Sequence, residues 1–202
     1  MNSKLSQLGL FLGVMVLALT IPVAVFLATQ DKNTTLYSRA GLTGSAFLYF
    51  WPAVISVPVC PSETALSSCP KSKVQIFLNT KDAVSGGADI VIKYDPRIIR
   101  IVDNKIFPGS VDDNFTLVYQ VFNYYRDSEV DNRSGLIKIK SSGNYKGERG
   151  IIATFFVNGL SVGESKLEFL AGGQYVDASK VWDEKEQNNI LGGVEGGVVK
   201  VQ

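Results

Sequence analysis

The side chains that most often carry out acid–base chemistry are few in this sequence, and their spacing assembles no catalytic pair. Histidine is absent, which removes the most common general base at neutral pH and the most common ligand of catalytic zinc. A glycoside hydrolase needs two carboxylates on either side of a cleft. Four carboxylates could be considered for that role: Asp95, Glu148, Glu164 and Glu168. Nothing in their spacing brings two of them together, and we therefore predict that the protein is not an enzyme.

Two cysteines, Cys60 and Cys69, lie close together in the Pro- and Ser-rich segment CPSETALSSCP. In an oxidising compartment they could close a short loop as a disulfide, and two reduced thiols are the alternative. A zinc site is disfavoured because no other cysteine and no histidine exists to complete tetrahedral ligation. The sequence predicts no cofactor.

A short acidic stretch, Asp112 and Asp113 followed by Asn114, offers oxygen atoms of the kind that calcium binds. Asp82 and Asp103 could lie nearby. The spacing does not match an EF-hand loop, so an ordinary solvated turn is the preferred interpretation and a weak calcium site is the alternative.

Aromatic side chains are the best candidates for binding. The run VYQVFNYYR contains Tyr119, Tyr124 and Tyr125, while Trp51 and Trp182 lie elsewhere. Exposed rings can stack on sugars or anchor a protein partner, whereas buried rings would only pack the core. Because alternation along a strand puts an aromatic residue of this run on either face, the sequence leaves both interpretations open.

The elements that must position these residues are β-strands. After residue 45, short segments rich in Val, Ile, Phe, Tyr and Thr recur between clusters of Gly, Pro, Asn, Asp and Ser. About nine strands are predicted: Ala46–Ile55, Lys73–Asn79, Gly87–Tyr94, Ile98–Val102, Phe115–Tyr125, Leu136–Ser141, Gly150–Asn158, Lys166–Leu170 and Val194–Val201. Such a series without helical periodicity predicts an all-β domain, a β-sandwich.

The N-terminal segment is of a different kind. Leu8 to Ala28 contains no charge over 21 positions, and a helix of that length spans a hydrocarbon core of about 30 Å. A secretory signal is the alternative, but cleavage after Ala28 would put Phe26 where a small residue is required. We predict a single transmembrane helix within residues 1–30, as an anchor or uncleaved signal, a polar tether over 31–45 and a folded domain over 46–202.

Charge excludes one class of partner. The chain of 202 residues has 20 Lys and Arg against 19 Asp and Glu, a net charge of +1. Nucleic acids are bound by clustered basic surface. The composition therefore argues against a nucleic-acid partner.

A resemblance to a known family is carried by the segment GGADIVIKYDPRIIRIVD, Gly86 to Asp103. Ile90 and Ile92 alternate inward before Tyr-Asp-Pro, and Pro96 fixes a tight, hairpin-like corner after which apolar residues return to the core. This strand, Tyr-Asp-Pro and strand resembles the signature of cohesin domains. GIIATFFVNGLSVGESKLEFL (150–170) and VEGGVVKV (194–201) look like later strands of the same family.

The resemblance implies a jelly-roll sandwich related to carbohydrate-binding modules, with one face that binds the small calcium-loaded dockerin module of an enzyme. Cohesins do not catalyse, and carbohydrate binding and polysaccharide catabolism follow from membership of the family. The expected partner is a dockerin-like module or a polysaccharide, and the expected location is the outer surface of a bacterial-type cell membrane. The alternative is an adhesin or an envelope spacer that binds other surface proteins.

Overall fold

The computed structural model describes residues 37–38, 42, 44–60, 68–112, 114, 116–173 and 175–202. This part of the chain contains fifteen strands: β1 (Tyr37–Ser38), β2 (Ala46–Trp51), β3 (Val54–Val57), β4 (Ser72–Asn79), β5 (Ser85–Lys93), β6 (Ile99–Pro108), β7 (Ser110–Val111), β8 (Leu117–Tyr119), β9 (Tyr124–Asp131), β10 (Leu136–Tyr145), β11 (Gly150–Gly159), β12 (Gly163–Phe169), β13 (Lys180–Asp183), β14 (Leu191–Glu195) and β15 (Gly197–Val201). The predicted membrane helix lies outside the described residues. Within them, no helix has the length and apolar character to cross a membrane.

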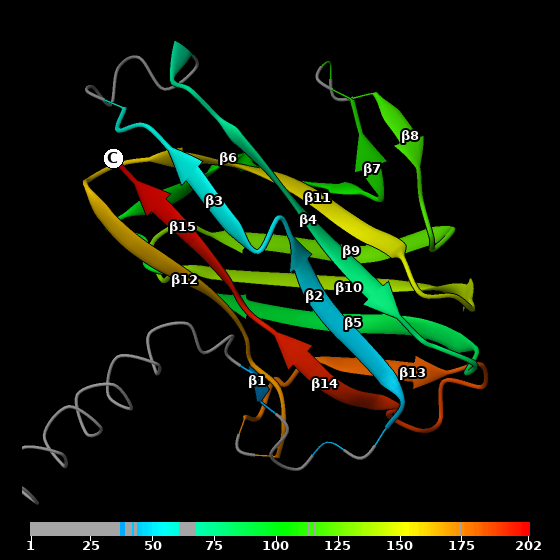
Figure 1. Ribbon diagram of the computed structural model, residues 1–202. Helices are drawn as coiled ribbons and strands as arrows, with labels where there is room; N and C mark the ends of the chain where they lie inside the picture. The colour runs from blue at the N-terminus through cyan, green and yellow to red at the C-terminus, as the bar shows by residue number, and fades with distance from the viewer. Residues whose placement is uncertain are drawn as a thin grey trace, which may run out of the picture. The chain divides into compact units, whose positions relative to one another are not determined.

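The strands form two stacked sheets and a small hairpin (Figure 1). One sheet has six strands in the order β1-β14-β2-β4-β11-β6, and the other has seven, in the order β3-β15-β12-β5-β10-β9 with β13 also paired to β5. Strands β7 and β8 pair with each other. The fold is therefore an all-β sandwich, as predicted.

Alternating aliphatic side chains fill the space between the sheets. In the six-stranded sheet, β4 buries Val74, Ile76 and Leu78 completely. In the seven-stranded sheet, β10 buries Ile137 and Ile139 in the same core. The intervening polar residues of these strands remain partly accessible. This is the two-residue period expected of strands with one buried face.

Two predicted strands are each divided where the chain passes from one sheet to the other. Within Ala46–Ile55, β2 belongs to the six-stranded sheet and β3 to the seven-stranded sheet; within Val194–Val201, β14 and β15 are divided in the same way. Pro52 lacks the N–H that would continue a ladder, and Gly196 and Gly197 allow the backbone to bend. Strands β2 and β14, and strands β3 and β15, pair in parallel across this switch.

The predicted strand Phe115–Tyr125 is also interrupted. Strand β8 ends at Tyr119 and β9 begins at Tyr124, and between them Val121 and Phe122 are both buried. Neighbouring residues of a regular strand point to opposite faces, so two successive buried side chains require an irregular backbone. Strand β13 was not predicted because its short, charged sequence is ordered by pairing with β5.

The Tyr-Asp-Pro corner joins the two sheets, so the hairpin-like corner expected from the sequence is wrong. Strand β5 lies in the seven-stranded sheet and β6 in the six-stranded sheet. Within the corner, the Asp95 carboxylate accepts the Arg97 backbone N–H at 2.9 Å and pairs with the Arg97 guanidinium at 2.7 Å. These hydrogen bonds from Arg97 lower the pKa of Asp95 to about 2.

One amide side chain links both sheets beside this corner. Asn132, in the turn between β9 and β10, accepts the Tyr94 hydroxyl at 2.6 Å and the Ile101 N–H at 2.8 Å through its Oδ1 atom. Its Nδ2 atom donates to the Ile101 carbonyl at 2.9 Å. Because Ile101 belongs to β6 of the opposite sheet, Asn132 holds the two sheets together at this end.

The predicted disulfide is present. Cys60 and Cys69 are bonded, with their Cα atoms 5.4 Å apart, a separation in the usual range for disulfides. Asn158 of β11 donates to the Pro70 carbonyl at 2.8 Å just beyond this bridge. The bridge thus lies where the chain enters the central strand β4.

We predict that Asn132→Ala lowers the free energy of unfolding by about 2–4 kcal/mol, because it leaves the Tyr94 hydroxyl and two backbone groups of Ile101 without partners. Urea denaturation of the full chain measures the change. The matched control is Asn123→Ala, at an exposed asparagine, which should change stability by less than about 0.5 kcal/mol. Equal effects of the two substitutions would contradict the proposed link between the sheets.

Candidate functional site

The outer face of the seven-stranded sheet is a regular surface of side chains that come from neighbouring strands. Along β9, β10, β5 and β12, alternate residues point away from the core, and most of them are charged. This surface, called the β5 face below, includes Asp127, Glu129, Lys138, Lys140, Asp89, Lys93, Glu164, Lys166 and Glu168. All nine side chains are exposed or half-buried.

Charges of opposite sign lie next to one another across the β5 face. Asp127 is in register with Lys140, Lys140 with Asp89, and Asp89 with Lys180 of β13. On a sheet, opposite charges that face each other on neighbouring strands attract, whereas like charges would repel. The alternation therefore stabilises a solvated face and keeps it from being uniformly acidic or basic.

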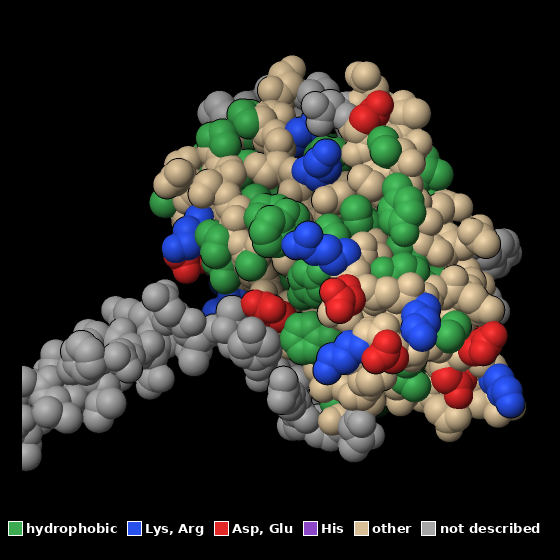
Figure 2. Space-filling view, turned by 45° about the vertical axis from the view of Figure 1, so that its right-hand side comes forward, with side chains coloured by type: hydrophobic (Ala, Val, Ile, Leu, Met, Phe, Trp, Pro, Cys, Tyr) green, Lys and Arg blue, Asp and Glu red, His purple; other side chains and the backbone are tan. Residues whose placement is uncertain are grey.

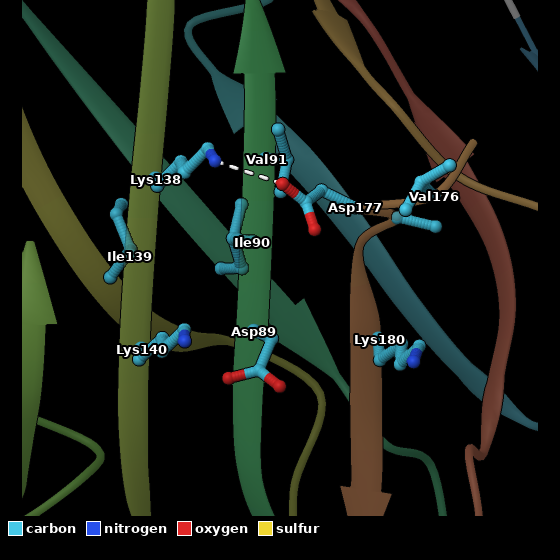
Figure 3. A pocket seen from close by; sticks show the side chains of 10 residues that line it. Asp89, Ile90, Val91, Lys138, Ile139, Lys140, Val176, Asp177 and Lys180 are labelled. Atoms are coloured by element: carbon cyan, nitrogen blue, oxygen red, sulfur yellow. Dashed lines mark hydrogen bonds and ion pairs between the residues drawn. The ribbon is translucent and has the colours of Figure 1, made fainter. Parts of the chain in front are cut away.

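A loop between β12 and β13, residues 170–179, is attached to β5 by its two ends. The Leu170 N–H donates to the Val91 carbonyl at 2.9 Å, and the Val91 N–H donates to the Ser179 hydroxyl at 2.9 Å. From the tip of the loop, the Asp177 carboxylate pairs with Lys138 of β10 at 2.9 Å (Figure 3). The outward-facing Val91 is consequently only 6% exposed.

Three lysines influence the Asp177 carboxylate. Its pKa is lowered first by the hydrogen bond and charge of Lys138 and then by the charges of Lys140 and Lys180. The same lysines line an open hollow of about 180 Å³ beside the loop, in which Asp89 is a second acidic group. Figure 3 shows these side chains placed around β5, with Lys138 and Lys140 on one neighbouring strand and Lys180 on the other.

The aromatic residues predicted from the sequence do not form one platform. Tyr119 is 48% exposed on β8. Trp182 is half-buried on β13, where its Nε1 atom donates to Asp89 at 3.0 Å. Tyr125 packs against the core, and its hydroxyl lies near the Gly109 backbone without a hydrogen bond of good geometry. Tyr124 begins β9, but its side chain is outside the described part of the structure.

The acidic candidates that the structure describes form local hydrogen bonds and ion pairs. The Asp112 carboxylate accepts the N–H groups of Asn114 and Thr116 at 3.0 and 2.8 Å, as in a side-chain-capped turn. Asp113 lies outside the described residues. Glu164 pairs with Lys200 at 3.1 Å. Among the residues that the structure describes, no three Asp, Glu, Cys or His side chains cluster as ligands for a metal ion.

Sequence reasoning named Trp51 as a candidate but missed the aromatic patch that it forms with Tyr49 and Phe77 on the outer face of the six-stranded sheet. The rings of Tyr49 and Phe77 stack with centroids 5.2 Å apart, and Trp51 is 56% exposed. Figure 2 shows hydrophobic side chains gathered on the visible surface between charged groups. The signal was the alternation in AFLYFW of β2. Phe47, Tyr49 and Trp51 are aromatic and face outward, whereas Ala46, Leu48 and Phe50 are buried.

Comparison with known proteins gives a match at the level of structure. No protein-family model matches the sequence, and no curated protein is similar to it. A cohesin from a Clostridium thermocellum type I cohesin–dockerin complex superposes with a TM-score of 0.55 at 12% identity, covering 82% of this chain and 98% of that one. The described part of this chain has the cohesin fold.

Two further cohesins agree with this assignment. A non-cellulosomal cohesin of the archaeon Archaeoglobus fulgidus has a TM-score of 0.53 at 11% identity, over 79% of this chain and 92% of its own. The third cohesin of an Acetivibrio cellulolyticus protein, solved with a dockerin, has a TM-score of 0.52 at 11% identity, over 77% and 98%. The cohesin fold that was expected from the Tyr-Asp-Pro segment is thereby confirmed.

The buried tyrosines predict how stability depends on alkaline pH. Burial raises the pKa values of Tyr94 and Tyr125, and the charge of Asp131 adds to the effect on Tyr94. Above about pH 10, the tyrosines of the unfolded chain lose protons that the folded chain keeps. Their contribution to the free energy of unfolding is therefore fully present below pH 10 and falls as pH rises. The maximum slope is about 1.4 kcal/mol per pH unit for each buried tyrosine.

We therefore predict that Tyr125→Phe leaves the free energy of unfolding at pH 7 unchanged or slightly higher, because it removes a buried hydroxyl that lacks a good hydrogen bond. Between pH 10 and 11 the variant should lose stability less steeply than the parent chain. Urea denaturation at pH 7, 10 and 11 measures both effects. A large loss at pH 7 would instead indicate that the hydroxyl makes a stabilising contact.

Proposed function

We propose that this protein is a non-catalytic binding module that engages a dockerin-type protein through the β5 face. The observation that carries the proposal is the combination of the cohesin fold with a broad, accessible sheet face of paired charges. Cohesins of similar fold were crystallised in complexes with dockerins. The proposal transfers that mode of binding to this chain.

The chemistry of the β5 face favours a protein over a sugar as its partner. Charged side chains alternate across four strands, and Trp182 lies at the margin with its Nε1 atom already bonded to Asp89. Sugars are bound by exposed aromatic rings, whereas protein interfaces use charge complementarity to fix register and orientation. A larger hollow on this face, of about 440 Å³, is open and lined by six charged side chains, whereas small-molecule sites are lined mainly by hydrophobic and aromatic residues.

We further propose that the module acts outside the cytoplasm, held to a membrane by residues 8–28. The uncharged run of 21 residues supports the anchor, and the Cys60–Cys69 disulfide supports an oxidising compartment. The polar tether over 31–45 would separate the two parts, and two of its residues form β1 at the edge of the six-stranded sheet. No cofactor and no catalytic residue enters this proposal.

The binding proposal predicts that the full-length chain in detergent micelles captures calcium-loaded dockerin modules, such as those of the Clostridium thermocellum and Acetivibrio cellulolyticus complexes. Lys140→Glu should weaken capture at least about tenfold, because it puts three acidic side chains side by side in the middle of the β5 face. Isothermal titration calorimetry with calcium, and after chelation, measures the affinity.

Lys146→Glu is the matched control, since this exposed lysine follows the end of β10 and lies off the face. The control should bind as the parent chain does. Failure of the parent chain to bind any dockerin of the panel would overturn the proposed partner, and equal loss in the two variants would overturn the proposed face.

The aromatic patch of Tyr49, Trp51 and Phe77 favours a second candidate function, binding of a polysaccharide on the six-stranded sheet. Trp51 is the most exposed of the three rings, and Gln75 of the neighbouring strand is directly opposite it in register. Exposed rings of this kind can stack on the faces of sugars. The two candidate functions use opposite sheets and are therefore separable by mutation.

For this candidate, we predict that Trp51→Ala abolishes retention of the full-length chain on insoluble polysaccharides while leaving dockerin capture unchanged. Removing an exposed ring should have little effect on folding. Co-sedimentation with cellulose, xylan and chitin measures retention. No retention of the parent chain would exclude these polysaccharides, and failure of both assays would favour an adhesin or an envelope spacer.

A further inference from the structure

The loop that lies on the β5 face ends in an unusually exposed apolar residue. Val176 is 101% exposed, the highest value for a large hydrophobic side chain among the described residues. Apolar side chains on a protein surface are common when they are scattered singly. Val176 differs because it projects from a loop that is fixed to the middle of the candidate binding face.

The attachment of the loop restricts where Val176 can lie. The two ends of the loop bond to Val91, and the next residue after Val176 is Asp177, which pairs with Lys138 on the far side of β5 (Figure 3). A further backbone bond joins the N–H of Ser179 to the carbonyl of Leu170 and closes the base of the loop. A contact residue held in place before binding loses less conformational entropy when a partner arrives.

The charged groups around the tip are of both signs. Lys138, Lys140 and Lys180 surround the hollow beside Val176, against two carboxylates. One of those carboxylates, Asp89, is already bonded by the Trp182 indole, and the other, Asp177, by Lys138. Lys140 is exposed in the middle of the face. Lys140 lies in register with Asp127 as well as with Asp89, so the charges around the tip are mixed and Val176 is the apolar group among them.

Resting on the proposed function, we infer that Val176 is the apolar anchor of the β5 face, and that the dockerin-type partner receives it in an apolar pocket. The anchor supplies affinity by leaving water, and the charges of both signs around it fix the register of the partner. The loop 170–179 is then a binding element and not merely a connection between β12 and β13.

The test compares Val176→Asp with Val162→Asp in the full-length chain, using the dockerin module that the parent chain binds most tightly from the panel above. Val162 is 74% exposed in the turn between β11 and β12 and is the matched control. Surface plasmon resonance should show that Val176→Asp weakens binding at least about tenfold, because a charge replaces the buried anchor, while Val162→Asp has no effect. Val176→Ile should retain binding.

Thermal unfolding checks that each variant remains folded, as expected for changes at exposed side chains.

The outcomes separate this inference from the proposed function. If the parent chain binds no dockerin, the proposed function fails and the inference fails with it. If the parent chain binds and Val176→Asp binds equally well, the anchor alone is overturned.

Discussion

Burial of one face of each sheet against the other is the constraint on which the rest of this structure depends. Because side chains alternate along a strand, packing Val74, Ile76 and Leu78 of β4 into the core leaves the intervening residues on the outside. The same alternation on β5 and β10 places Asp89 and Lys140 on an outer face that has no part in the core. The candidate binding face is thus produced by the packing of the sandwich.

The connections between the sheets determine how firmly that face is held. The Tyr-Asp-Pro corner leads from β5 into β6 of the opposite sheet, and Asn132 links the two sheets at this corner through Tyr94 and Ile101. The chain also changes sheets between β2 and β3 and between β14 and β15. These segments pair in parallel on both sides of the change, β2 with β14 and β3 with β15. Rigid support of this kind allows a loop such as 170–179 to be positioned on the face with little cost on binding.

The two outer faces of the sandwich differ in chemistry. The β5 face consists of paired charges with one apolar tip, whereas the opposite sheet exposes Tyr49, Trp51 and Phe77. The two surfaces belong to different sheets, so a partner bound to one would leave the other accessible. The cohesin fold supplies two such faces, and the residues on them specify what each can bind.

The sequence by itself determined the all-β class, the positions of the core strands and the similarity to cohesins, because these depend on local alternation and on the Tyr-Asp-Pro turn. It also indicated the disulfide from the closeness of Cys60 and Cys69. Only the tertiary structure decided that Tyr125 is buried, that Asp177 reaches Lys138 and that Val176 projects from the β5 face. These facts depend on residues distant in the sequence, since strand order and sheet switching bring them together and no local pattern records those pairings.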